Sequence, residues 1–202
     1  MLFLGPVYQL VQTQLEHRIN HWPLVRLIMY SLDKTILYLL LFWVGRLVWL
    51  RVTRRRTTLG HELKVVVFAG YVILLLMLTV FRRWYYPWEL QFYFDHPLRD
   101  INWTPLVETL KLRAGFSQFD FWYQSLGNVV WFVPFGFGLP WVSRRRLGVP
   151  AVVGISLLFS LLIETMQFLL YSGVADIDDL LFNTLGAIIG ALAYRLLLGR
   201  HR

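Results

Sequence analysis

Polar side chains recur at helical spacing inside one of the most apolar runs of the chain. Separated by 4, 4, 3 and 4 residues, they are Ser156, Ser160, Glu164, Gln167 and Tyr171. This spacing places them on one face of a helix, and such a face must meet protein or water rather than lipid. A carboxylate inside a bilayer costs about 3 kcal/mol or more unless it is paired, protonated or hydrated. Glu164 is therefore predicted to belong to a functional site.

A second polar stripe starts in the acidic segment ADIDD. At spacings of 3, 4, 3 and 4, its members are Asp176, Asp179, Asn183, Gly186 and Gly190. The glycines predict close packing against another helix. The aspartates are also typical of a helix N-terminus, where carboxylates accept hydrogen bonds from free N–H groups. Capping for Asp176, and interhelical hydrogen bonding for Asn183 and Gln167, stay open as alternatives to ligand binding.

Three apolar segments bring six polar residues to the same predicted membrane depth. The predicted ligand-binding residues are Asn128, Glu164, Gln167, Asp176, Asp179 and Asn183. The chain has no cysteine and no histidine in a polar stripe, so neither is expected as a nucleophile or general base. Carboxylates and amides could hold Mg²⁺ or Ca²⁺, or equally a cationic or hydroxyl-rich headgroup. We expect no cofactor, and a divalent cation stays open as the alternative; no catalytic residue or metal ligand is assigned.

The composition is that of an integral membrane protein. Of the 202 residues 57% are hydrophobic and only 16% are charged, against roughly 25% charged in soluble domains. The net charge of +8 comes from short basic clusters between apolar runs. Such clusters are typical of residues that orient a protein in a membrane, so we expect membrane lipids rather than nucleic acid as partners.

Five segments are predicted to cross the membrane as helices. They are residues 33–50, 65–81, 127–142, 149–171 and 179–198. The predicted fold class is thus an all-α membrane protein with a bundle of about five transmembrane helices. Residues 1–30 mix charged with apolar side chains, which is typical of an interfacial amphipathic segment. Arg46 lies near the end of the first span and is predicted to extend to the interface.

The basic residues predict the orientation. Basic clusters lie in segments 51–64 and 143–148 and in the tail 199–202, which are therefore assigned to the inside. Five further basic residues lie in the much longer loop 82–126, namely Arg82, Arg83, Arg99, Lys111 and Arg113. Alternation then places the loop 172–178, which has no Lys or Arg, on the outside. The aromatic-rich loop 82–126 is predicted to be outside as well, with short interfacial helices. The chain is therefore expected in the cell membrane as a multi-pass protein with a cytoplasmic C-terminus.

Four motifs resemble those of the VanZ-like membrane proteins. They are NWTPL at 102–106, FVPFG at 132–136 after Asn128, ETMQ at 164–167 and DIDDLLFNTLG at 176–186. The resemblance covers roughly residues 70–198. It implies a VanZ-like four-helix membrane domain over 65–198. Outside the resemblance, we expect an N-terminal amphipathic segment with one extra helix and a basic loop over 1–64, and a basic tail over 199–202.

The resemblance also implies a direction for function. The family takes its name from a protein associated with resistance to teicoplanin-type glycopeptides. Gly173 stands where the family commonly has an arginine, so the cation beside the acidic cluster is expected to be Arg82, Arg83 or another residue.

Three functional hypotheses follow. The first is a binding protein for an amphipathic or lipid-linked ligand at the outer face, such as a lipid-linked cell-wall precursor or a glycopeptide, linked to resistance or to the cell envelope. The alternative is a metal-assisted enzyme acting on a polyprenyl or envelope lipid. In the third, the polar residues only hold helices together. Whether the protein is an enzyme stays open.

Overall fold

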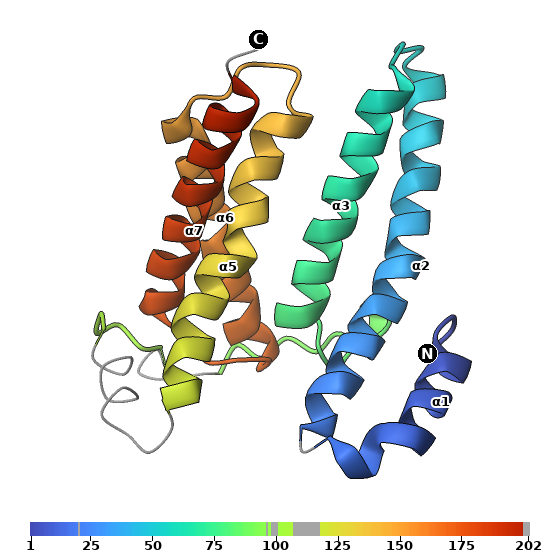
Figure 1. The fold of residues 1–202 in the computed structure, drawn as a ribbon, viewed down its shortest axis with the longest axis vertical. Helices are drawn as coiled ribbons and strands as arrows, with labels where there is room; N and C mark the ends of the chain where they lie inside the picture. Colours follow the sequence, from blue (N-terminus) through green and yellow to red (C-terminus); the bar gives the residue numbers. More distant parts are fainter. Residues whose placement is uncertain (20, 96, 98–100, 107–117, 200–202) are drawn as a thin grey trace. The chain divides into compact units, whose positions relative to one another are not determined.

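The computed structural model describes residues 1–19, 21–95, 97, 101–106 and 118–199. Helices dominate this part of the chain (Figure 1). In chain order they are α1 (Gly5–Leu15), the short η1 (Glu16–Arg18), α2 (Trp22–Val52), α3 (Leu59–Thr79), the short η2 (Pro87–Glu89), α5 (Gln118–Val142), α6 (Val149–Leu170) and α7 (Ile177–Leu197).

Four helices in the described part are long and apolar enough to cross a membrane, namely α2, α3, α6 and α7. A shorter apolar stretch, Leu126–Val142, lies within α5. Each of the five predicted spans lies inside one of these helices or extends at most two residues past its end. The predicted all-α, multi-pass membrane fold is confirmed.

Two compact units divide the chain, Met1–Leu90 and Gln91–Arg202. The first contains α1, α2 and α3, and the second contains α5, α6 and α7. The domain boundaries expected from the sequence, after residues 64 and 198, stay predictions.

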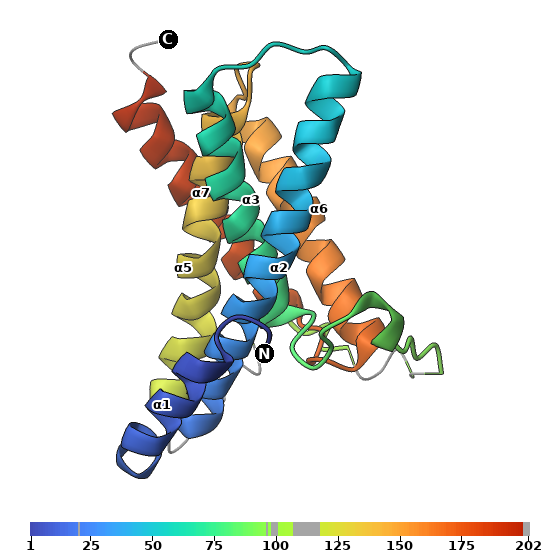
Figure 2. The ribbon, with the colours of Figure 1, turned by 90° about the vertical axis from the view of Figure 1, so that its right-hand side faces the viewer.

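In the first unit, α2 is longer than the predicted span. The helix begins at Trp22, and Pro23 lies in its first turn, where the missing N–H of proline removes no hydrogen bond. The 31 residues extend about 46 Å at 1.5 Å per residue, more than a hydrocarbon core of roughly 30 Å. The last residues of the predicted interfacial segment therefore belong to the same helix as the first span, and α1 forms a separate helix beside its start (Figures 1 and 2).

Asp33 ties α1 to α2. Its carboxylate is fully buried and accepts hydrogen bonds from the backbone N–H groups of Leu2, Phe3 and Leu4 at 2.6–2.7 Å. These N–H groups precede or begin α1, where a helix leaves its first donors without partners. The Tyr85 hydroxyl donates to the same carboxylate at 2.6 Å.

Lys34, the next residue, ties α2 to the end of α3. It is fully buried, and its ammonium donates to the carbonyl oxygens of Phe81 and Trp84, the latter at 3.3 Å. Its Nζ atom also lies 4.5 Å from the centre of the Tyr30 ring, a cation–π contact. Among the described residues, Lys34 forms no ion pair with a carboxylate. Backbone carbonyl groups and an aromatic face stabilise its charge instead.

Arg46, which the sequence predicted to extend to the interface, has a partner that the sequence did not reveal. Its guanidinium forms a two-pronged ion pair with Glu62 of α3, at 3.0 and 2.9 Å. Glu62 also accepts from the Thr57 hydroxyl at 2.8 Å in the connection between the two helices. The pair thus joins α2 and α3 near the basic end of the hairpin.

In the second unit, α5 and α7 approach each other at glycine. A Cβ atom added to Gly136, Gly186 or Gly190 would lie 2.1, 2.2 or 2.0 Å from a backbone oxygen of the facing helix. No side chain fits at such distances, so glycine is required for this contact. The predicted close packing at Gly186 and Gly190 is confirmed. Helix α5 runs without a break through Pro134.

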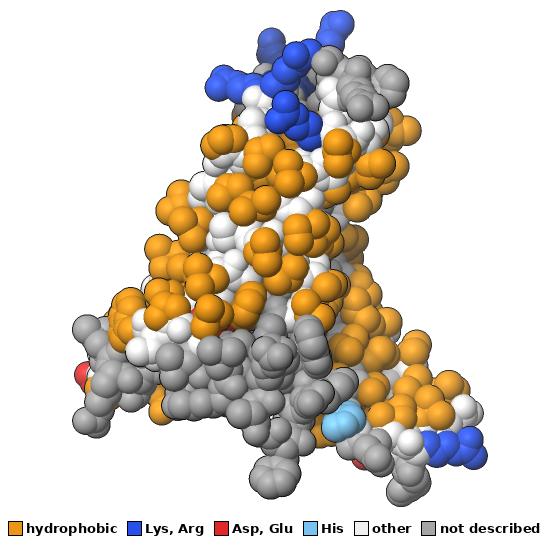
Figure 3. Space-filling model, turned by 60° about the vertical axis from the view of Figure 1, so that its left-hand side comes forward, with side chains coloured by type: hydrophobic (Ala, Val, Ile, Leu, Met, Phe, Trp, Pro, Cys, Tyr) orange, Lys and Arg blue, Asp and Glu red, His pale blue; other side chains and the backbone are white. Residues whose placement is uncertain are grey.

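The outward side of α7 is apolar. Exposed side chains recur every three or four residues, namely Leu181, Leu185, Ile189, Leu192 and Leu196. Hydrophobic side chains cover much of the described surface in Figure 3, where most Lys and Arg lie at the top and a smaller group lies at the lower right. The glycine and polar stripe of α7 therefore faces its neighbours, while the leucine stripe is available to lipid.

Candidate functional site

The candidate site lies where the start of α7 meets α5 and the end of α6. Asp176 is the N-cap of α7, and its carboxylate accepts from the Asp178 N–H at 2.8 Å. Capping is therefore part of its role, as the sequence allowed. Its second oxygen accepts from the Asn102 side-chain amide at 3.0 Å.

Asn102 holds the segment 101–106 against the start of α7. Its backbone N–H donates to Ala175 O at 2.9 Å, and its carbonyl accepts from the Ile177 N–H at 3.1 Å. Its side-chain oxygen also accepts from the Thr104 N–H and hydroxyl. Sequence reasoning used Asn102 only as a family marker and missed this contact with the acidic segment.

Asp178 was also missed, although it is the most buried of the three aspartates. Its side chain is 2% exposed and accepts from the Leu106 N–H at 2.7 Å. Leu106 has φ of 62°, a left-handed conformation that costs a residue with a Cβ atom roughly 1–2 kcal/mol. Asp178 lies on neither of the two helical stripes, and its partner Leu106 lies in a loop, so helical spacing does not indicate this contact.

Two hydrogen bonds connect α7 to its neighbouring helices. The Asn128 amide of α5 donates to the Asp179 carboxylate. One turn further along α7, the Asn183 amide donates to the Ser160 hydroxyl of α6 at 2.9 Å. Asn183 is 4% exposed, and interhelical hydrogen bonding, one of the two roles left open for it, is thus observed.

Glu164 lies one turn from Ser160 on α6 and is 5% exposed. One carboxylate oxygen accepts from the Asp176 N–H at 3.1 Å. In the described part of the chain, no Lys or Arg forms an ion pair with it. A buried carboxylate held by one backbone donor has unused capacity to accept hydrogen bonds.

Gln167 lies in the last turn of α6. It is 6% exposed and packs against Gly173, where an added Cβ atom would lie 3.3 Å from Gln167 Cδ. Tyr171 ends the helix with φ of 53°, and the Ser172 N–H donates to Gln167 O at 3.0 Å. An arginine at position 173 would thus have to displace the Gln167 side chain.

The structure therefore brings all six predicted residues to one end of the second unit and links five of them by hydrogen bonds to one another or to α6. Whether they bind a ligand stays a prediction. The described residues contain no group of three His, Asp or Glu side chains arranged to hold a metal ion. The geometry thus offers no observation that favours the metal-dependent alternative.

A family model described as VanZ/LLP1 matches residues 68–198. The chain belongs to the VanZ/LLP1 family. Protein VanZ of Enterococcus faecium is 29% identical over 138 residues, which cover 68% of this chain and 77% of that protein. No solved structure matches the chain.

The VanZ/LLP1 match contains the whole candidate site, from Asn102 to Asn183. It also contains most of α3 and the three glycines at which α5 meets α7. Helices α1 and α2, with Asp33 and Lys34, precede the matched segment. The acidic start of α7 and its support therefore belong to the family portion of the chain.

Proposed function

We propose that this VanZ/LLP1 protein binds the polar headgroup of an amphipathic or lipid-linked molecule where α5, α6 and α7 meet. The buried Glu164 carboxylate, without an ion pair among the described residues, is the observation that carries the proposal. A purely structural role would be served at lower cost by an uncharged residue, because an isolated carboxylate in a membrane is expensive.

Buried polar atoms without hydrogen-bond partners support the proposal that a ligand binds here. The Asn183 side-chain oxygen and the Ser172 hydroxyl are buried and have no hydrogen-bond partner among the described residues. Buried polar groups without partners are uncommon in folded proteins and mark places where water or a ligand completes the hydrogen bonding. The Glu164 carboxylate and the side-chain oxygen of Asn183 would accept hydrogen bonds from a hydroxyl-rich or cationic headgroup.

The proposed location gives this binding a role in the cell envelope. With the basic segments inside, the Glu164 end of the second unit faces the outer leaflet of the cell membrane. Lipid-linked cell-wall precursors and glycopeptides are amphipathic molecules that would reach a site there. We therefore propose that the chain reduces the action of teicoplanin-type glycopeptides, in line with the family resemblance.

Glu164→Gln tests this function because it keeps the size of the side chain and removes its charge. Cells that express the variant should lose the increase in teicoplanin inhibitory concentration that the unchanged chain confers. Thr165→Val, on the exposed face of the same helix, is the matched control and should keep it. Membrane abundance and thermal unfolding of both purified variants establish that they fold.

Two results would overturn the proposal. One is full resistance in the Glu164→Gln variant at normal abundance. The other is a thermal unfolding temperature that rises with Mg²⁺, falls with EDTA and loses this dependence in Asp176→Asn, which would favour the metal-dependent enzyme instead.

A further inference from the structure

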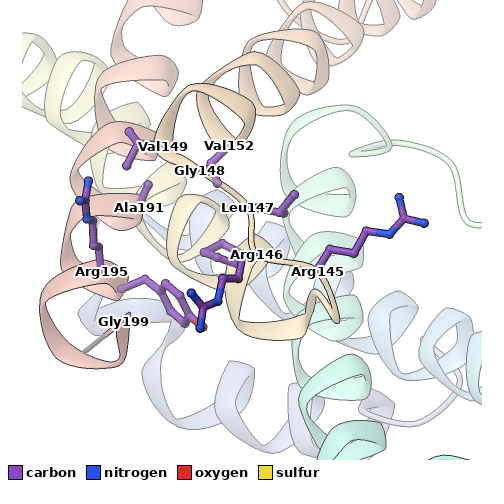
Figure 4. A pocket seen from close by; sticks show the side chains of 11 residues that line it. Arg145, Arg146, Leu147, Gly148, Val149, Val152, Ala191, Arg195 and Gly199 are labelled. Carbon is purple, nitrogen blue, oxygen red and sulfur yellow. The ribbon is translucent and has the colours of Figure 1, made fainter. Parts of the chain in front are cut away.

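A second polar site lies at the opposite end of α5, α6 and α7, away from Glu164. A cavity of about 330 Å³ opens between the end of α5, the loop that follows it, the start of α6 and the end of α7. This volume falls within the range of about 300 to 1,000 Å³ typical of small-molecule sites. Three arginines line it, Arg145 and Arg146 from the loop and Arg195 from α7 (Figure 4).

The charge of this site is uncompensated. Arg145, Arg146 and Arg195 are exposed, and none forms an ion pair with a described carboxylate. The sequence has no Asp or Glu over residues 121–163 or 180–202, so these helices supply no acidic side chain at the cavity end. An anion is therefore the complementary ligand, and guanidinium groups match the oxygens of a phosphate in particular.

The arginines do not point the same way. In Figure 4, Arg146 extends from the loop toward α7, which carries Arg195, whereas Arg145 extends to the other side. The N-terminus of α6 also opens here, after Gly148, and its free N–H groups favour negative charge. Arg146 and Arg195 thus line the cavity from the loop and from α7, respectively.

The rest of the lining is apolar. Leu147, Val149, Val152 and Ala191 line the cavity beside the arginines. Exposed Leu192 and Leu196 continue from this end along the outward side of α7. A ligand with a phosphate at one end and hydrocarbon at the other matches both parts of this surface.

We propose that this cavity binds the phosphate headgroup of an anionic membrane lipid, with Arg146 and Arg195 as its ligands and the outward face of α7 along its acyl chain. Basic pockets between transmembrane helices are suited to such headgroups. A soluble phosphate would use the arginines but gain nothing from the apolar lining. The proposal is independent of the function proposed for Glu164.

Native mass spectrometry of the full chain in detergent tests the site, with phosphatidylglycerol and phosphatidylcholine as probes. Phosphatidylglycerol should bind in preference. Arg146→Gln and Arg195→Gln should each weaken its binding about five-fold, equivalent to about 1 kcal/mol. Arg146→Lys should retain most of the affinity.

Arg144→Gln is the matched control. It removes the same charge from the same loop, but Arg144 does not line the cavity, so binding should not change. An equal loss in Arg144→Gln and Arg146→Gln would overturn the proposal, because general attraction would then explain it. Equal binding of both lipids would overturn it as well, and displacement by inorganic phosphate at lipid-like concentrations would assign the cavity to a soluble anion.

Discussion

Among single residues, Asp178 shows how an acidic side chain can be structural beside a site proposed to bind a ligand. It is buried and accepts from the N–H of Leu106, a residue in a left-handed conformation. The carboxylate therefore stabilises a loop conformation that leucine does not favour by itself. Asp178 and Glu164 are both carboxylates at the same end of the unit, but only Glu164 lacks a structural explanation for its charge.

Asp178→Ala should lower stability because it leaves the Leu106 N–H without its acceptor. Losing the partner of a buried donor costs about 1–3 kcal/mol, which corresponds to a decrease of about 2–12 °C in the unfolding temperature for a chain of this size. Asp178→Asn keeps an acceptor oxygen and should recover most of the loss. Differential scanning fluorimetry in detergent measures both variants, with the exposed Asp95→Ala as the control. Equal unfolding temperatures for Asp178→Ala and the control would contradict this role.

Tyr85 predicts a dependence of stability on alkaline pH. Burial, and the hydrogen bond that its hydroxyl donates to Asp33, raise the pKa of Tyr85 above its ordinary value near 10. The folded state then keeps the phenol protonated while the unfolded state ionises. This contribution to stability is complete below about pH 10 and decreases as the pH rises further.

The measurement for Tyr85 is chemical unfolding at pH 8 and at pH 11. Tyr85→Phe should be less stable than the unchanged chain at pH 8, because the hydrogen bond is lost, and the difference should shrink at pH 11. Tyr93→Phe, an exposed tyrosine that donates to Gln91, is the control. A constant difference between the two pH values would show that the Tyr85 proton is not linked to folding.

The sequence located the candidate residues by helical spacing, and this worked where partners lie on helices. Glu164, Asp179 and Asn183 were placed on facing stripes, and hydrogen bonds connect these stripes in the structure. Asn102 and Asp178 were not found, because their contacts join a loop to a helix start across more than 70 residues. Periodicity carries no information about such contacts.

At the scale of helices, the approach of α5 and α7 depends on the absence of side chains. Backbone oxygens of Val129, Val133 and Ala187 occupy the positions where Cβ atoms of the facing glycines would lie. Small residues of this kind let helices pack closely in a membrane, where no hydrophobic effect brings them together. This contact orients the acidic start of α7 relative to Asn128.

Gly190→Ala should therefore separate α5 from α7. Its Cβ atom would lie 2.0 Å from Val133 O, and overpacking of this kind typically costs about 1–3 kcal/mol. Gly154→Ala on α6 is the matched control, since no atom lies within 4 Å of its added Cβ. Size-exclusion profiles and thermal unfolding should be impaired for Gly190→Ala only. Equal behaviour of the two variants would contradict the close contact.

Helix positions followed from apolar runs, but the length of α2 did not. The sequence predicted an interfacial segment over residues 1–30 and a span that starts at residue 33, whereas α2 begins at Trp22 and continues through Asp33 and Lys34. The structure instead buries both charges, Asp33 against the first backbone N–H groups of the chain and Lys34 against carbonyls after α3. In the sequence alone, a charge that the free backbone groups of a helix end neutralise cannot be distinguished from a charge that ends a transmembrane helix.

For the whole molecule, each compact unit has one strongly basic connection between two of its helices. The α2–α3 connection carries Arg54, Arg55 and Arg56, and the α5–α6 connection carries Arg144, Arg145 and Arg146. The α6–α7 connection carries no basic residue and leads into the acidic start of α7. The positive-inside rule therefore predicts that both basic connections are cytoplasmic and that the acidic segment is outside.

Labelling of single cysteines tests this orientation, and the absence of native cysteine removes any background. Val174→Cys, 71% exposed in the α6–α7 connection, should react with a membrane-impermeant maleimide in intact cells. Leu59→Cys, 89% exposed at the start of α3, should react only after permeabilisation, and it leaves every basic residue in place. The reverse pattern would move Glu164 to the cytoplasmic side and exclude direct binding of an extracellular glycopeptide there. The Arg146–Arg195 cavity would then face the outer leaflet, so this measurement also decides which lipids can reach it.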